Sequence, residues 1–338
     1  MFSYAFAEVS ARVKPMKGKT GPVPNLLRPL LDTYLDAAVA LVGCRSRDLE
    51  RYSCEYDVLV VTAEKRPPTT LKIGDAVVDL FFATENEVLK PMNPEHAVSL
   101  ATARPVRDTS LIISTTSAAN SAILPESASK ASRTRLASAL KVLGRAEEAL
   151  RRKEVVDADF WLLAASYELG YAWLLSKEVL PSPSHLLSQL RETKGIPRSF
   201  EGFSLGAGLE AAGRAGCGAR LDGVTVLHDL LRERSTAPSA ESSWSSARTE
   251  LLSAKANELL TRIELAECYS YLGQEVVDDI LALLRSNPRR TLTSLMTGTE
   301  GLLGERLVRQ LGLARAEGAV REGLEATKEQ VSALAREA

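Results

Sequence analysis

The chain has 338 residues, of which 45% are hydrophobic and 25% are charged, a balance typical of folded proteins and not of disordered ones. Its 42 basic and 43 acidic residues give a net charge of −1, so nucleic-acid binding would need a local basic patch. The length favours two domains over one.

The four cysteines indicate the compartment. Cys44, Cys54, Cys217 and Cys268 form no C-x-x-C pair, which argues against a zinc site or a thioredoxin-like motif. Scattered cysteines fit a reducing environment. The N-terminal residues lack the charged start and apolar core of a secretory signal, and no apolar run reaches the length of a membrane span. We therefore expect a cytoplasmic protein with no membrane partner.

The first third of the chain alternates between helical and strand-like patterns. Residues 1–25 are assigned no element, because prolines and glycines interrupt a basic stretch. Helical spacing predicts a helix over residues 26–35, and apolar runs predict strands over 38–42 and 58–62. Further predictions are a hairpin of residues 71–73 and 77–82, a short helix from Pro94, and a strand or buried loop at 111–113.

From about residue 127 the composition changes. Strand-like runs end, and alanine, leucine, glutamate and arginine dominate. We predict a central apolar helix over 158–175, a long helix within 242–272 and an amphipathic helix from about 302 to the end. The expected fold class is α+β. A small mixed-sheet domain with flanking helices (26–126) would be followed by an all-helical domain (127–338), with the boundary in the small, polar stretch 114–132.

Three acidic residues interrupt the apolar runs of the first domain. Glu55 and Asp57 are two residues apart at the start of a strand, so their side chains point the same way. Asp79 lies within another apolar run, and Gly43 forms a turn after the first strand. Several carboxylates on one face make a poor core and a good seat for a divalent cation. The pattern suggests metal-assisted phosphoryl chemistry on a nucleotide.

These segments resemble a known superfamily. Gly43-Cys44-Arg45-Ser46-Arg47, Glu55-Tyr56-Asp57 and Val78-Asp79-Leu80 match, in order and spacing, the motifs of the DNA polymerase beta-like nucleotidyltransferases. The resemblance covers roughly residues 26–114. The helical region from 145 to 191 is similar, less specifically, to the helical substrate-binding domains that accompany minimal nucleotidyltransferases.

The resemblance implies an activity and assigns roles. The chain would move a nucleoside monophosphate from a triphosphate, ATP in the first instance, to an acceptor by a two-metal mechanism with Mg²⁺. Glu55 and Asp57 would hold both metals, while Asp79 would hold the acceptor-side metal and help to deprotonate the attacking hydroxyl. The triphosphate would be bound by the turn residues Gly43, Cys44, Arg45, Ser46 and Arg47.

Three departures from the family pattern leave an alternative open. Cys44 replaces the usual serine, Glu55 replaces the usual first aspartate, and Asp48 replaces a frequent glycine. A thiol is a weaker donor to phosphate than a hydroxyl. The alternative is a catalytically impaired protein of this fold that binds nucleotide and serves in regulation or interaction. The acceptor (small molecule, RNA or protein) and a homodimer formed through the helical domain also stay open.

Overall fold

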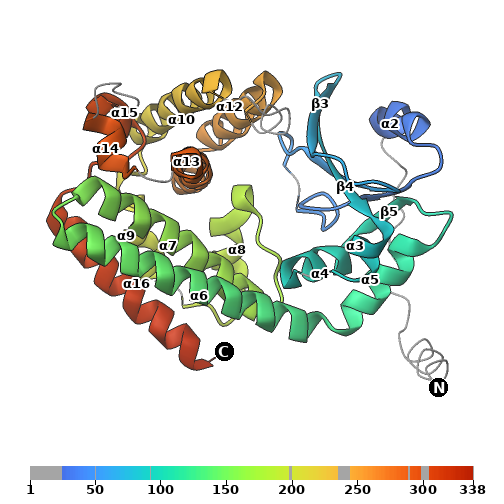
Figure 1. Ribbon diagram of the computed structural model, residues 1–338, viewed down its shortest axis with the longest axis horizontal. Coiled ribbons are helices and arrows are strands. Elements are labelled where there is room, and N and C mark those ends of the chain that lie inside the picture. Colours follow the sequence, from blue (N-terminus) through green and yellow to red (C-terminus); the bar gives the residue numbers. More distant parts are fainter. Residues whose placement is uncertain are drawn as a thin grey trace. The chain divides into compact units, whose positions relative to one another are not determined.

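The structure is a computed structural model that describes residues 25–49, 51–91, 93–197, 200–234, 244–287, 290–297 and 304–337. The expected N-terminal segment therefore lies almost wholly outside the described residues. The chain divides into two compact units, residues 1–128 and 129–338. Together they have the α+β composition that the sequence predicts, with a sheet in the first unit and helices in the second (Figure 1).

The first unit is built on a five-stranded mixed sheet with the strand order β3-β4-β2-β1-β5. The central pair β2 and β4 is parallel, and the other neighbouring pairs are antiparallel. The strands are β1 (Ala38–Leu41), β2 (Tyr56–Thr62), β3 (Thr69–Ile73), β4 (Ala76–Thr84) and β5 (Arg104–Arg107). The predicted strands at 38–42 and 58–62 and the hairpin are confirmed.

Both faces of the sheet are covered. The helix α2 (Arg28–Thr33) follows a short 3-10 turn, η1 (Asn25–Leu27), and lies on one side, where Leu30 packs in a cluster with Val58. On the other side lie α3 (Glu85–Leu89), α4 (Pro94–Ala101) and α5 (Ile112–Ala122), and here Ile113 packs in a cluster with Leu59 (Figure 1). Strand alternation thus sends successive residues of β2 into two separate cores.

The prediction of a strand or loop at residues 111–113 is wrong, because Ile112 and Ile113 begin α5. The carboxylate of Asp108 accepts hydrogen bonds from the backbone N–H groups of Ile113 (3.1 Å) and Ser114 (2.7 Å), and so caps the helix. A three-residue apolar run is too short to distinguish a strand from a helix. The edge strand β5 was not predicted, since it has only four residues, one of them Pro105.

The second unit is helical throughout its described residues. Its first long helix, α6, begins in the first unit and runs through the polar stretch where the sequence places the domain boundary. The helices are α6 (Leu124–Arg151), α7 (Val155–Ser176), α8 (Leu186–Glu192), α9 (Glu201–Gly206), α10 (Arg214–Arg234), α12 (Ser246–Thr261), α13 (Leu265–Ser286), α14 (Leu292–Thr297), α15 (Gly304–Gln310) and α16 (Glu317–Glu337), with 3-10 turns η2 (Pro183–His185) and η3 (Leu209–Ala211).

The predicted central helix is confirmed as α7. Seventeen of its 22 residues are buried, so it is apolar around most of its circumference, as a helix inside a bundle must be. One of its polar residues, Asp159, has a partner from a distant part of the chain. Its carboxylate accepts hydrogen bonds from the backbone N–H of Arg315 (3.0 Å) and from Nε of the same residue (2.7 Å). This pair joins α7 to the segment before α16.

Two predicted helices are each divided in the structure. The stretch 242–272, of which residues 242 and 243 lie outside the described part, contains α12 and the start of α13. Between them Ile263 has a φ of +62°, which no helix interior accepts. The C-terminal stretch likewise divides into α15 and α16, and Gly312, with a φ of +75°, lies in the connection. Residues 261–265 contain neither glycine nor proline, so no turn residue predicts the first break.

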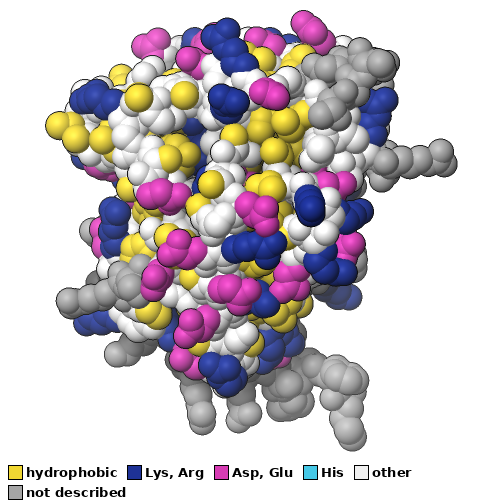
Figure 2. All heavy atoms as spheres, turned by 90° about the vertical axis from the view of Figure 1, so that its left-hand side faces the viewer, with side chains coloured by type: hydrophobic (Ala, Val, Ile, Leu, Met, Phe, Trp, Pro, Cys, Tyr) yellow, Lys and Arg dark blue, Asp and Glu magenta, His cyan; other side chains and the backbone are white. Residues whose placement is uncertain are grey.

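No helix among the described residues has both the length and the apolar composition of a membrane span. On the face shown in Figure 2, basic and acidic side chains are interspersed, in keeping with the net charge of −1.

Candidate metal and nucleotide site

The structure brings together the three acidic residues singled out from the sequence. Asp57 on β2 and Asp79 on β4 are direct neighbours in the parallel register, and Glu55 lies just before β2. One carboxylate oxygen from each residue lies within 4.8 Å of the other two, and all three residues are half-buried. Three carboxylates at this spacing repel one another unless cations lie between them.

The strands explain why the acids share one face. In β2 the buried residues Val58 and Leu59 point to opposite faces, and Asp57 has the same orientation as Leu59. The parallel pairing of β2 with β4 then places Asp79 beside Asp57 on that face. The acids therefore lie at the beginning of β2, on the same face of the sheet as Leu59.

The turn after β1 approaches Asp57 closely. Gly43 has a φ of +69°, and a Cβ atom at this position would lie 2.0 Å from Oδ2 of Asp57. The backbone N–H of Val42 also donates to the Asp57 carbonyl oxygen (2.9 Å). Glycine is thus required twice here, by its backbone conformation and by the neighbouring carboxylate.

Two other turn residues donate to the Gly43 carbonyl oxygen. Oγ of Ser46 does so at 2.9 Å and Nε of Arg47 at 3.0 Å. Burial lowers the pKa of the Arg47 guanidinium, while Asp57 and Cys44 act in the opposite direction. Arginine stays charged under such shifts, so Arg47 brings a positive charge to the carboxylate cluster. Binding of phosphate by Ser46 and Arg47 stays a prediction.

Arg45 is engaged within the chain. Its guanidinium donates to the carbonyl oxygens of Cys54 and Glu55, at 2.9 Å from Nε to the latter, and lies over the ring of Tyr56 at 3.9 Å from the ring centroid. These contacts fix the start of β2 against the turn. Arg45 therefore positions Glu55, and a direct contact with phosphate stays a prediction.

Cys44 is buried and hydrogen-bonded. The hydrogen bond with the Cys54 side chain, then burial, then the charges of Glu55 and Asp57 raise the pKa of the Cys44 thiol. The thiol is neutral at physiological pH for this reason. A fourth negative charge is thereby kept away from the three carboxylates.

Asp48, the other departure in the turn, is exposed and has a φ of +56°. Its carboxylate lies 3.9 Å from the guanidinium of Arg104 on β5. A basic neighbour thus offsets part of the negative charge that replaces glycine in the family pattern.

Thr70 is a site residue that the sequence analysis missed. Its Oγ1 donates a 2.6 Å hydrogen bond to Oδ1 of Asp79, across the antiparallel pair of β3 and β4. The signal was present in the hairpin, because a turn at Gly74-Asp75 pairs Ile73 with Ala76 and hence Thr70 with Asp79. Such a bond fixes the orientation of a metal-binding carboxylate.

The donor set fits magnesium. Carboxylate oxygens are the hard ligands that Mg²⁺ and Mn²⁺ prefer, and three of them converge here without a competing thiolate or imidazole in the set. A Cβ atom at Gly43 would collide with the Asp57 carboxylate, so glycine allows the backbone of the turn to lie directly beside the carboxylates. Glu55, Asp57 and Asp79 are therefore the residues that could hold such an ion.

No protein-family model and no curated protein matches this chain. A solved structure of a nucleotidyltransferase-like protein from Exiguobacterium sibiricum 255-15 aligns with 85% of this chain and 86% of its own length, with a TM-score of 0.34 and 12% sequence identity. A likeness at this level carries no argument about chemistry, so the candidate site rests on its own geometry.

Proposed function

We propose that this chain is a nucleotidyltransferase that transfers a nucleoside monophosphate from a triphosphate, with ATP as the first candidate, to an acceptor hydroxyl. The observation that carries the proposal is the convergence of the Glu55, Asp57 and Asp79 carboxylates within 4.8 Å, next to a glycine turn. The three residues would hold Mg²⁺, which, when bound, neutralises the charge that develops on the phosphate oxygens.

The chain's own residues have distinct tasks in this proposal. Asp79, oriented by Thr70, takes the proton of the attacking hydroxyl. The hydroxyl oxygen then bonds to the α-phosphorus, and the bond from that phosphorus to the pyrophosphate oxygen breaks. Gly43 lets the triphosphate approach the backbone of the turn, and Arg47 adds positive charge.

The test is a transfer assay. The full chain is incubated with Mg²⁺, a cell extract and each of the four ribonucleoside triphosphates labelled at the α-phosphate, and both labelled product and released pyrophosphate are measured. We expect label transfer that Asp57→Asn reduces by at least a hundredfold. Asp75→Asn, which removes an exposed acid from the nearby hairpin turn, is the matched control and should transfer at the wild-type rate. Equal rates for the wild type and Asp57→Asn would refute the proposal.

A second candidate is a nucleotide-binding protein that has lost catalysis. Two observations favour it: the Cys44 thiol is buried, and the Arg45 guanidinium is bound to backbone carbonyl oxygens. Calorimetric titration with ATP and Mg²⁺ separates the two candidates. Binding without pyrophosphate release supports the second, and binding with release supports the first.

A further inference from the structure

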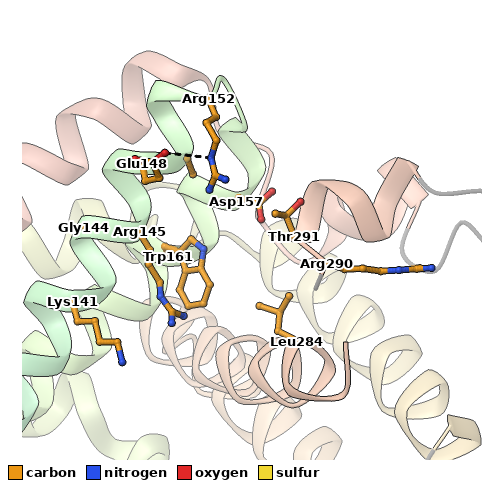
Figure 3. A pocket seen from close by; sticks show the side chains of 11 residues that line it. Lys141, Gly144, Arg145, Glu148, Arg152, Asp157, Trp161, Leu284, Arg290 and Thr291 are labelled. Carbon is orange, nitrogen blue, oxygen red and sulfur yellow. Dashed lines mark ion pairs between the residues drawn. The ribbon is translucent and has the colours of Figure 1, made fainter. Parts of the chain in front are cut away.

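The helical unit contains a cavity of about 360 Å³ bounded by α6, α7, the end of α13 and the segment that precedes α14 (Figure 3). Lys141 and Arg145 enter it from one face of α6, since residues four apart are neighbours on a helix. Arg290 lies on the opposite wall, where its side chain extends away from Trp161, and Trp161 and Leu284 form the apolar part of the cavity. All of these residues belong to the second unit.

The acidic residues of this cavity already have partners. Glu148 lies 3.7 Å from Nε of Arg152, as the dashed line in Figure 3 marks. The carboxylate of Asp157 accepts hydrogen bonds at 2.7 Å from the backbone N–H groups of Leu292 and Thr293, and so caps α14.

Three basic side chains that line the cavity are not paired with its acidic residues. Within the described part of the chain, no ion pair involves Lys141, Arg145 or Arg290. All three are exposed, while Trp161 beneath Arg145 is half-buried, with the guanidinium carbon 4.6 Å from the ring centroid. The cavity therefore combines an excess of positive charge at its mouth with an aromatic floor.

Gly144 keeps one wall of the cavity open. It lies inside α6, where glycine costs about 1 kcal/mol relative to alanine. A Cβ atom there would meet nothing within 4 Å, so packing within the chain does not require glycine. The absent side chain exposes the backbone of α6 between Lys141 and Arg145, at the point where a ligand would lie.

We propose that this cavity binds the phosphate monoester of a small organic molecule. A phosphate monoester carries nearly two negative charges at neutral pH, which suits the neighbouring cations Lys141 and Arg145 of α6. Trp161 and Leu284 would receive the organic part, and the volume suits a small molecule. The proposal is independent of the nucleotidyltransferase proposal, because it concerns other residues in the other unit.

The test is calorimetric titration of the full chain with phenyl phosphate in EDTA, which removes the divalent cations that the acidic site would need. We expect saturable binding that Arg145→Gln and Lys141→Gln each weaken about tenfold. Gly144→Leu should abolish binding by filling the cavity, without lowering the melting temperature, because leucine is a better helix former than glycine. Arg321→Gln, which removes an exposed charge from α16 outside the cavity, is the matched control and should bind as the wild type does.

Absence of saturable binding would overturn the proposal, as would equal affinities for the wild type, Arg145→Gln and Gly144→Leu. A parallel titration with a short single-stranded RNA tests the other source of phosphate groups. If RNA binds with this dependence on the variants and phenyl phosphate does not, a nucleic-acid surface replaces the small-molecule site.

Discussion

Gly43 and Asp57 are so close that a single added carbon on Gly43 would lie 2.0 Å from the Asp57 carboxylate. The turn after β1 and the acidic start of β2 thus pack directly against each other. The proposed function depends on this contact, since it places the backbone of the glycine turn beside the candidate metal ligands.

Gly43→Ala should therefore impair the site more than its backbone strain explains. The matched control is Gly74→Ala in the β3–β4 turn, because Gly74 also has a positive φ (+60°) but has nothing within 4 Å of an added Cβ. Both variants should lose about 1 kcal/mol of unfolding free energy from the left-handed backbone, measured by urea unfolding, and Gly43→Ala should lose more because its Cβ meets the Asp57 carboxylate. Only Gly43→Ala should also lose nucleotide transfer, and equal transfer by the two variants would contradict the contact's role.

Thr70→Val should weaken metal binding without disrupting the sheet. Valine keeps the shape and strand preference of threonine but removes the 2.6 Å hydrogen bond to Asp79. A lost bond of this kind typically costs a metal site about tenfold in affinity, which a Mn²⁺ titration measures. Thr69→Val changes the adjacent residue, which points to the other face of β3, and should leave the affinity unchanged. A loss of affinity shared by both variants would indicate general damage to β3.

The ionisation of Glu87 should make the stability of the first unit sensitive to acid. Hydrogen bonds from Lys65 and from the backbone and side chain of Thr84 lower the pKa of Glu87 from 4.5 to about 2. Because the folded-state pKa is below the unfolded one, the stabilisation is complete above about pH 4.5 and is lost as the pH falls toward 2.

The pH dependence of the melting temperature between 4.5 and 2 checks this expectation. Glu87→Gln should make that dependence weaker, whereas Glu85→Gln, an exposed acid in the same helical turn, should leave it unchanged. Parallel profiles for the wild type and Glu87→Gln would show that the hydrogen bonds from Lys65 and Thr84 do not lower the pKa of Glu87 as described.

Asp159→Ala should destabilise the helical unit strongly. The Asp159 side chain is almost completely buried, and its loss leaves Arg315, whose own side chain is 13% exposed, without its carboxylate partner. Removal of one member of a buried pair costs about 3–5 kcal/mol. Glu317→Gln breaks the exposed pair with Arg321 and should cost less than about 1 kcal/mol, so urea unfolding of the two variants gives a direct comparison. Similar losses of unfolding free energy for both variants would show that burial of the Asp159 pair adds nothing to its contribution to stability.

The sequence predicted those parts of the candidate site that depend on local patterns. Strand alternation predicts that Glu55 and Asp57 point the same way, and the apolar run around Asp79 predicts a buried strand. The pairing of β2 with β4, which brings Asp79 next to Asp57, is a contact between distant segments that the runs alone do not specify. Only the resemblance to a known family supplied that step.

Other features depend on contacts that no local pattern carries. The sequence predicts that Arg45 binds phosphate. In the structure its guanidinium is instead held by the carbonyl oxygens of Cys54 and Glu55, nine and ten residues further along the chain. The helix break at Ile263 was not predicted because it depends on a positive φ at a residue that is neither glycine nor proline. The cavity beside Gly144 arises from helices that are more than a hundred residues apart in the sequence.

The most direct test of the central claim is the affinity for Mn²⁺ in the presence of a non-hydrolysable ATP analogue, measured by electron paramagnetic resonance on the full chain. We predict saturable binding that Glu55→Gln, Asp57→Asn and Asp79→Asn each weaken at least tenfold, while Asp75→Asn binds as the wild type does. Wild-type affinity in the Asp57→Asn and Asp79→Asn variants would contradict the assignment of these carboxylates as a metal site.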